Sequence, residues 1–382
     1  MILPTTYQTA LLLLVLSMVC WGSWANTFKL TGPKWRFELF SYDYAFGVLI
    51  ASLVAAYTLG SHGSELNFSD RLLVTGLRNQ AFILAGGIIF AIANTLLMAA
   101  ISVAGMSVAF PVGIGLALVV GVSLNYVLNP QGNPYLLFGG ILLVVLAIIA
   151  DSQAYRLKDR EVRQAKAAAD KVAQERAQAE AAELASAASE AAKSQTRKMA
   201  VRGRVLQPRK RIKTPARGIV LSLVAGLLMG FFYPLVSVGM MGEFGAGAYG
   251  AAVVFSIGVL ASSLVCNFVF LNIRLIGDPI SIRTYFKGTR RQHLLGLFGG
   301  IVWAAGGISN FAAATAPESI QVGPAISLAM GQCATLISVL WGLFVWKEFR
   351  GASHSVYWTL ALMMLLFSGG LALLALAPIV KF

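Results

Sequence analysis

Ten long apolar segments leave this chain few ways to fold. An α-helix crosses the hydrocarbon core of a bilayer with about 20 apolar residues, and it makes its backbone hydrogen bonds within itself. Only 12% of the 382 residues are charged, whereas soluble proteins carry about 25%. The sequence therefore predicts an all-α integral membrane protein, with transmembrane helices at residues 7–28, 37–60, 80–101, 105–127, 134–154, 218–241, 247–271, 293–316, 320–346 and 356–378.

The two halves of the chain repeat each other. A glycine pair and a proline recur 213 residues later, and the segment that starts at Gly47 recurs at Gly258, 211 residues later. The recurring residues are Gly86, Gly87 and Pro111, matched by Gly299, Gly300 and Pro324. Because each copy holds an odd number of spans, the second copy lies inverted, as in transporters built from internal repeats. We predict two inverted five-helix repeats, residues 1–154 and 218–382, joined by a linker at residues 155–217.

Positive charge falls on one side of this arrangement. The net charge is +14, and the Lys and Arg residues follow odd-numbered spans, except for Arg71, Arg78 and Lys381. Because cytoplasmic loops carry the excess of Lys and Arg, we predict a multi-pass protein of the plasma (inner) membrane with a cytoplasmic central linker and both termini outside. The N-terminus lacks the basic region and cleavage site of a signal peptide, so we expect the first span to be retained. The basicity thus indicates topology and does not indicate nucleic-acid binding.

The central linker differs in composition from both halves. Residues 155–193 are rich in Ala, Glu, Gln, Lys and Arg, which favour helix. We expect a solvated helix or a partly disordered segment that projects into the cytoplasm. The basic stretch from Arg202 to Arg217 is either a regulatory or docking arm, or a charged linker near anionic headgroups, which we favour.

Ionisable side chains inside a bilayer are costly and mark functional sites. We place only Glu38 and Asp43 within a span, at the cytoplasmic start of the second, and assign the other acidic residues to loops, termini and linker. Acids also favour the first turn of a helix, and Lys34 and Arg36 are close enough in sequence to pair with them. Asp43, about two turns into the helix, is the stronger candidate for proton coupling or substrate contact.

The sequence offers no residues for enzyme chemistry. All three histidines, His62, His293 and His354, fall at span edges or in loops. We find no Ser-His-Asp set, paired carboxylates or metal cluster for the membrane interior, and no phosphate-binding loop. The three cysteines lie singly inside spans and indicate neither a disulfide nor a metal site. We therefore expect no enzymatic activity, no metal and no cofactor.

Neutral polar and aromatic side chains remain as candidates for substrate binding. Amides, hydroxyls and aromatic faces near the midplane can orient a small uncharged ligand, although the same residue types form interfacial belts and join neighbouring helices. Gln332, Asn94 and Trp303 lie closest to the middle of their spans, and Asn94 corresponds to Gly307 in the other copy. The candidates are Trp21, Trp24, Asn26, Asn94, Asn125, Tyr233, Trp303, Asn310 and Gln332.

Small residues are candidates for packing and hinge positions. Paired glycines offer surfaces at which helices pack closely or slide. The two prolines either release backbone carbonyls towards a cavity or simply begin their spans. The candidates are Gly86, Gly87, Pro111, Gly299, Gly300 and Pro324.

Five short motifs outside the linker carry a family resemblance. They are Trp21-Gly-Ser-Trp24, Leu124-Asn125-Tyr126, Asn272-Ile-Arg274 with Pro279, Phe298-Gly299-Gly300 and Lys347-Glu348-Phe349-Arg350. The chain resembles the ureide permease family, within the drug/metabolite transporter superfamily. That resemblance implies ten spans in two inverted halves and proton-linked uptake of nitrogen heterocycles such as allantoin and uracil. The linker lacks the phosphate loop described for plant members, and spans 3–4 and 8–9 also resemble the bacterial rhamnose and glucose uptake branch.

We therefore expect a secondary transporter that imports a small neutral polar solute by alternating access. A ureide or nucleobase is the first choice of solute and a sugar the second. Efflux of amphipathic compounds, or a membrane scaffold that acts through its linker, are the alternatives. The expected partners are the solute, protons and the lipid bilayer, for a monomer or a homodimer.

Overall fold

The computed structural model describes residues 2–32, 34–62, 67–104, 106–192, 215–272, 279–320 and 322–380. Within them, ten helical segments are long and apolar enough to cross a membrane, which confirms the predicted all-α membrane fold. The elements are α1 (Tyr7–Ser23), α2 (Ala25–Leu30), α3 (Phe37–Tyr57), α4 (Phe68–Val74), α5 (Leu77–Ala104), α6 (Met106–Leu128), α7 (Pro134–Ala192), α8 (Pro215–Met240), α9 (Gly247–Asn272), η1 (Ile282–Lys287), α10 (Arg290–Ala314), η2 (Glu318–Ile320), α11 (Pro324–Gln332), α12 (Ala334–Leu340), η3 (Trp341–Val345) and α13 (His354–Leu376).

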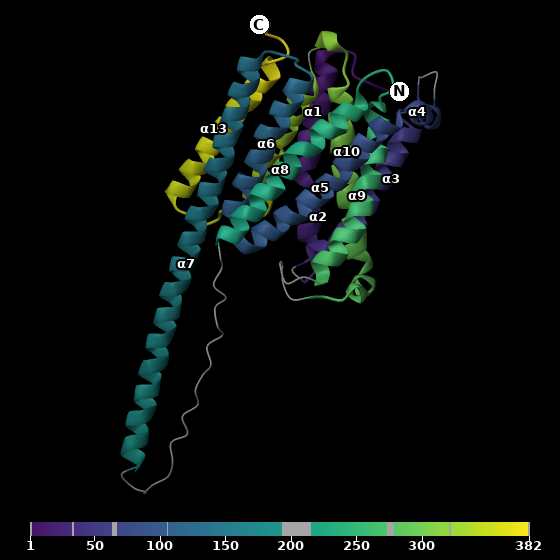
Figure 1. The fold of residues 1–382 in the computed structure, drawn as a ribbon. Coiled ribbons are helices and arrows are strands. Elements are labelled where there is room, and N and C mark those ends of the chain that lie inside the picture. The colour runs from purple at the N-terminus through teal and green to yellow at the C-terminus, as the bar shows by residue number, and fades with distance from the viewer. Residues whose placement is uncertain are drawn as a thin grey trace.

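The contacts between the two halves occur in matched pairs. Helix α5 packs against α8 and α9, and its counterpart α10 packs against α1 and α3. Likewise α6 packs against α8 while α12 packs against α1, and α7 packs against its own counterpart α13. Exchanging the halves therefore reproduces the pattern of neighbours, which is consistent with the predicted inverted repeats. Both termini lie at one end of the bundle, and α7 extends from the other end (Figure 1).

Glycines allow the closest crossing of α3 and α10. A Cβ atom at Gly300 would lie 2.0 Å from the carbonyl oxygen of Tyr44, and one at Gly47 would lie 2.1 Å from that of Leu297. Real Cβ atoms do not approach backbone this closely, so only glycine fits either position. The α3–α10 crossing thus depends on a glycine from each half.

The crossing of α5 and α9 has the same construction. A Cβ atom at Gly87 would lie 2.2 Å from the carbonyl oxygen of Phe255, and one at Gly258 would lie 2.4 Å from that of Leu84. Gly87 and Gly258 are the repeat counterparts of the two glycines at the α3–α10 crossing. Each crossing therefore joins one repeated glycine of the first half to one of the second half. Exchanging the two halves converts one crossing into the other.

The other four hinge candidates lie in different settings. Gly86 faces Val236 of α8, and Gly299 faces Thr27 of α2. Pro324 occupies the first turn of α11, where its missing N–H has no helical partner to lose. Pro111 instead lies inside α6, so the two prolines differ in their local setting.

Two spans are locally interrupted. The first span changes from α1 to α2 at Trp24, where Thr27 N–H bonds to the Trp24 carbonyl three residues back. The ninth span changes from α11 to α12 at Cys333 in the same way, and η3 then continues it as a π-helix. Mid-helix 3₁₀ geometry and π turns often mark hinges or functional sites.

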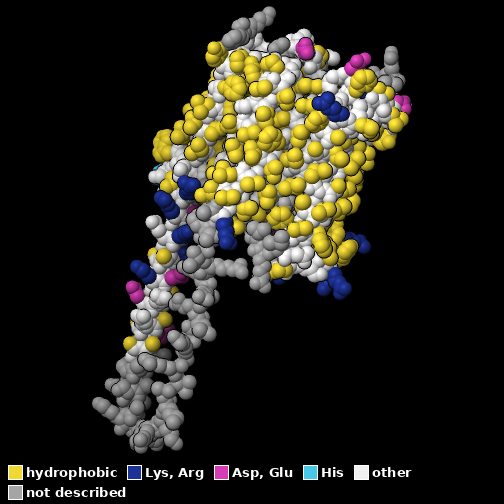
Figure 2. Space-filling view, in the orientation of Figure 1, with side chains coloured by type: hydrophobic (Ala, Val, Ile, Leu, Met, Phe, Trp, Pro, Cys, Tyr) yellow, Lys and Arg dark blue, Asp and Glu magenta, His cyan; other side chains and the backbone are white. Residues whose placement is uncertain are grey.

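Helix α7 runs without interruption for 59 residues, from its membrane span into the predicted linker. Residues 162–182 are exposed throughout, and this part projects away from the bundle (Figure 1). Lys and Arg side chains gather along it and at the same end of the bundle (Figure 2). Most of the basic stretch from Arg202 to Arg217 lies outside the described residues.

Candidate functional site

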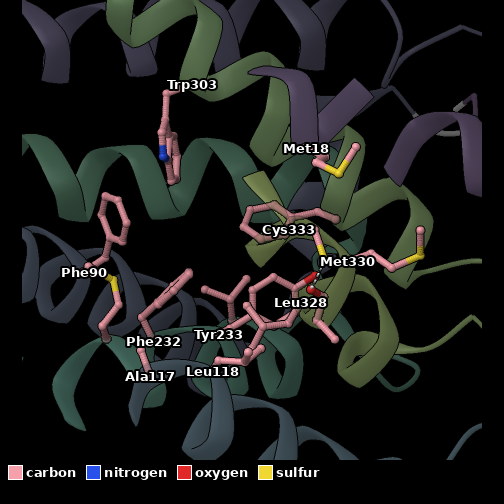
Figure 3. Packing of buried hydrophobic residues seen from close by; sticks show 14 of the residues in the cluster. Met18, Phe90, Ala117, Leu118, Phe232, Tyr233, Trp303, Leu328, Met330 and Cys333 are labelled. Carbon is pink, nitrogen blue, oxygen red and sulfur yellow. Dashed lines mark hydrogen bonds between the residues drawn. The ribbon is translucent and has the colours of Figure 1, made fainter. Parts of the chain in front are cut away.

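Trp303 of α10 lies at the centre of a cluster of aromatic side chains contributed by both halves. Its ring stacks on Phe255 of α9 and on Trp21 of α1, each at a centroid distance of 5.7 Å, and lies 4.8 Å from Phe90 of α5. The Trp21 Nε1 atom also donates a hydrogen bond to the Trp303 carbonyl at 3.2 Å. Figure 3 shows Trp303 facing Phe90, with Phe232 of α8 next to Phe90. Trp303 itself is only 6% exposed.

Trp303, Asn94 and Gln332 are among the predicted substrate residues that keep free hydrogen-bonding groups. Within the described part of the chain, the Trp303 Nε1 atom and the amides of Asn94 and Gln332 make no hydrogen bond. Asn94 lies one helical turn from Phe90 on α5, so the two side chains share a face. Gln332 ends α11 next to Gly331, where a Cβ atom would lie 2.6 Å from the Trp21 ring. Asn94 thus lies on the helix that contributes Phe90 to the cluster, and Gln332 follows a glycine that packs against Trp21.

There is room inside the bundle near small residues. A Cβ atom at Gly307, one turn beyond Trp303 on α10, would first meet the Trp303 ring at 3.4 Å, an ordinary contact. Gly115 of α6 is buried, yet a Cβ atom there would have nothing within 4 Å. Helices of both halves thus leave interior space unfilled at these positions.

Tyr233 and Asn310, two more predicted substrate residues, are fully buried and bonded to each other. The Tyr233 hydroxyl donates to Asn310 Oδ1 at 2.5 Å. Asn310 Nδ2 donates to Ser17 Oγ at 3.2 Å and to the Ser327 carbonyl at 2.9 Å. The amide of Asn310 therefore joins α8, α1 and α11 to α10, and it holds the helices around the aromatic cluster.

Trp24 and Asn26 lie at the interruption of the first span. Trp24 packs on Tyr44 at 5.0 Å between ring centroids, and Asn26 Oδ1 accepts a hydrogen bond from Trp346 Nε1 at 2.6 Å. Trp341 Nε1 donates to Ser23 Oγ at 2.9 Å. Residues on either side of the first interruption are thus bonded to η3 and to Trp346, which follows it.

Asn125 of α6 is fully buried and separate from this group. Its Nδ2 atom donates to the Gly121 carbonyl of its own helix at 2.7 Å. Its Oδ1 atom has no partner within the described residues.

Asp43 forms a polar cluster with two residues to which the sequence analysis gave no role. Its Oδ1 atom accepts a hydrogen bond from the Tyr285 hydroxyl of η1 at 2.6 Å, and its Oδ2 atom lies 2.8 Å from His293 Nδ1 of α10. The His293 ring meets the edge of Trp35 at 5.5 Å. Burial and the Asp43 carboxylate raise the pKa of Tyr285, so its hydroxyl remains a donor at neutral pH.

Glu38 is fully buried and bound by the guanidinium group of Arg36 through both carboxylate oxygens. This is the structural pairing that the sequence offered as the alternative to a coupling role. The carboxylate is therefore already neutralised by a fixed cation.

Asp151 was missed because we assigned it to the charged linker. It lies inside the fifth predicted span, on α7, and is 6% exposed. The signal was available, since the acid interrupts an otherwise apolar run that continues to Ala154.

Comparisons with known proteins agree with one another. The sequence model of the ureide permease family matches residues 41–377. Ureide permease 2 of Arabidopsis thaliana is 24% identical, over 96% of this chain and 96% of that protein. Ureide permease 1 of the same plant is also 24% identical with the same coverage, and ureide permease 5 is 21% identical over 96% of this chain and 93% of its own length.

Proposed function

This chain belongs to the ureide permease family, and on that premise we propose that it imports a ureide or nucleobase, such as allantoin or uracil. It is a multi-pass membrane transporter by family and by its ten candidate spans. The relatives are named for ureides, which favours this substrate class over the sugars, amphipathic compounds and scaffold role that the sequence left open.

The observation that carries the proposal is the free Nε1 atom of Trp303 within a stacked aromatic cluster. A flat heterocycle can stack on indole faces, while its amide edges bond to Trp303 and to the amides of Asn94 and Gln332. The charged clusters at Asp43 and Glu38 involve other partners, so the substrate would be held by neutral groups. A neutral ligand needs no buried counter-charge.

Alternating access would use the boundary between the two halves. Substrate contacts come from both halves, because Asn94 lies on α5 while Trp303 and Gln332 lie on α10 and α11. Rocking of one half against the other, around the glycine crossings, would open the site first to one side and then to the other. The candidate hinges are Gly86, Gly87, Pro111, Gly299, Gly300 and Pro324.

We assign proton coupling to Asp43 with its partner His293. These residues join α3 of the first half to α10 of the second, so a proton gained or lost there changes a contact between the halves. Glu38 is less suited to this role, because Arg36 holds both of its carboxylate oxygens.

We place the α7 extension in the cytoplasm and both termini outside. The Lys and Arg residues at the end of the bundle that carries α7 support this orientation (Figure 2). Exposure of a C-terminal epitope tag on intact cells would agree with it, and cleavage of that tag only from the cytoplasmic side would contradict it.

Ligand-dependent thermal stability of the purified protein tests the substrate class. A ligand at about 100 times its dissociation constant adds about 2.7 kcal/mol to the free energy of unfolding, so a true substrate raises the melting temperature measurably. We expect stabilisation by allantoin or uracil. Stabilisation by glucose or rhamnose alone would favour the sugar alternative, and stabilisation by amphipathic drugs alone would favour efflux.

A further inference from the structure

A buried carboxylate outside the proposed substrate and Asp43 sites lies at the end of the bundle that carries the α7 extension. Asp151 is 6% exposed, and its Oδ1 atom has no hydrogen-bond donor within the described residues. An ionised carboxylate buried without a partner costs several kcal/mol. Asp151 therefore requires something that removes its charge.

The neighbouring charged groups do not neutralise the Asp151 carboxylate. Glu348, which follows η3, acts on Asp151 as a second negative charge. Glu348 takes the ammonium group of Lys29 on Oε1 at 2.5 Å and the Tyr155 hydroxyl on Oε2 at 3.0 Å. The side chains of Lys29 and Glu348 are 44% and 32% exposed, whereas Asp151 is almost completely buried. Lys29 thus pairs with the outer carboxylate, Glu348, and within the described residues no cation pairs with Asp151.

Other groups near this part of α7 have different contacts. Lys158 lies 5.1 Å from the centroid of the Phe349 ring, and Glu161 accepts a hydrogen bond from the backbone of Ser353. Helix α6, which packs against α7, has no charged residue within its bounds. The remaining charged or titratable groups on α7 up to Asp159, on the loop after η3 and on α13 are Tyr135, Tyr155, Arg156, Asp159, Lys347, Arg350, His354 and Tyr357.

We propose that Asp151 takes up a proton when this end of the bundle closes and releases it when the end opens. The proposal rests on alternating access in the proposed function. Closure brings Lys29 of the first half onto Glu348 of the second, and a proton on Asp151 balances the one positive and two negative charges. Opening separates Lys29 from Glu348 and admits water, in which a carboxyl group loses its proton at neutral pH.

This site differs from the Asp43 cluster in how its charge is balanced. Asp43 has His293 and Tyr285 as hydrogen-bonding partners. Asp151 has no such partner within the described residues, and its protonation therefore follows the opening and closing of the bundle directly. The chain would then hold two proton-binding carboxylates, at two contacts between its halves.

Infrared spectra of the full chain in lipid vesicles test this without a substrate. The wild type is expected to show a carboxylic acid C=O band at neutral pH that Asp151→Asn removes. Asp159→Asn, on the exposed part of α7, is the matched control and should leave the band unchanged. A folded wild type without an Asp151-dependent band would overturn the proposal.

Transport assays separate this proposal from the proposed function. Asp151→Asn should keep substrate exchange at equal pH but lose about tenfold or more of the accumulation driven by a pH gradient. If the wild type exchanges neither allantoin nor uracil, the proposed function fails, and the infrared result still decides the protonation of Asp151. If Asp151→Asn accumulates substrate as the wild type does, the proton at Asp151 is not part of the cycle and the proposal is wrong.

Discussion

At the scale of single residues, Trp303 is the most informative position. Trp303→Phe keeps an aromatic ring in the stack and removes the Nε1 donor. A hydrogen bond contributes about 0.5–1.5 kcal/mol net, so we expect KM for allantoin or uracil to rise about three- to tenfold. Initial rates of labelled uptake measure this.

Trp358→Phe is the matched control, because Trp358 of α13 is 74% exposed on the outside of the bundle. It should leave KM unchanged. An equal rise in KM for both variants would show that the loss at Trp303 comes from general tryptophan replacement and not from a substrate contact.

Asp43 is the residue to test for coupling. Asp43→Asn removes the titratable carboxylate but preserves an acceptor for Tyr285, so we expect exchange of substrate at equal pH to continue. Accumulation driven by an inward proton gradient should fall by about tenfold or more. One unit of pH or pKa corresponds to a factor of ten in an equilibrium ratio, and the variant no longer couples that ratio to the substrate. Asp70→Asn, at an exposed position of α4, should behave as wild type. Unchanged gradient-driven accumulation in Asp43→Asn would exclude Asp43 as the coupling group.

Sequence reasoning at this scale identified residue types but not their partners. Asn310 and Tyr233 were chosen as ligand-binding groups, yet they bond to each other and to neighbouring helices. His293 was placed at a span edge without a role, and it lies against Asp43 from 250 residues away. Which polar groups satisfy each other depends on tertiary packing, which residue types and their spacing in the sequence do not determine.

At the scale of helices, the glycine crossings should be the most sensitive to added volume. Gly300→Ala would place a Cβ atom 2.0 Å from the Tyr44 carbonyl, and α3 and α10 would have to separate. Overpacking of this kind costs about 1–3 kcal/mol. We expect a clear fall in melting temperature in detergent, together with slower transport.

Gly139→Ala is the control for that experiment. Gly139 lies in the membrane span of α7, where a Cβ atom would make only an ordinary contact at 3.6 Å with Leu373. It should be neutral or slightly stabilising, because alanine favours helix over glycine. A similar loss in both variants would mean that Gly300 is not a special crossing point.

Hydropathy located the spans because bilayer crossing demands about 20 apolar residues wherever it occurs. The same signal could not locate the interruptions at Trp24 and Cys333, because apolar residues continue through both. The hydropathy pattern also predicts that the fifth span ends at residue 154, whereas α7 continues as one helix to Ala192. Helix formation in the linker follows from residue propensity, which does not depend on burial.

At the scale of the whole molecule, the α7 extension should be separable from transport. Residues 162–182 are exposed throughout, so deletion of residues 163–182 removes little that packs on the bundle. We expect this variant to fold and to keep uptake within about twofold of wild type, since surface changes usually cost little stability. Loss of function in a folded, membrane-inserted deletion variant would instead favour a scaffold that acts through its linker.

The central claim is that the two halves together import a neutral, amide-rich heterocycle. Its most direct test is the accumulation of labelled allantoin and uracil in proteoliposomes that contain the wild-type protein and carry an inward proton gradient. We expect at least one of these compounds to accumulate above its external concentration, and a protonophore to abolish that accumulation. Accumulation of glucose or rhamnose with neither heterocycle transported would contradict the account.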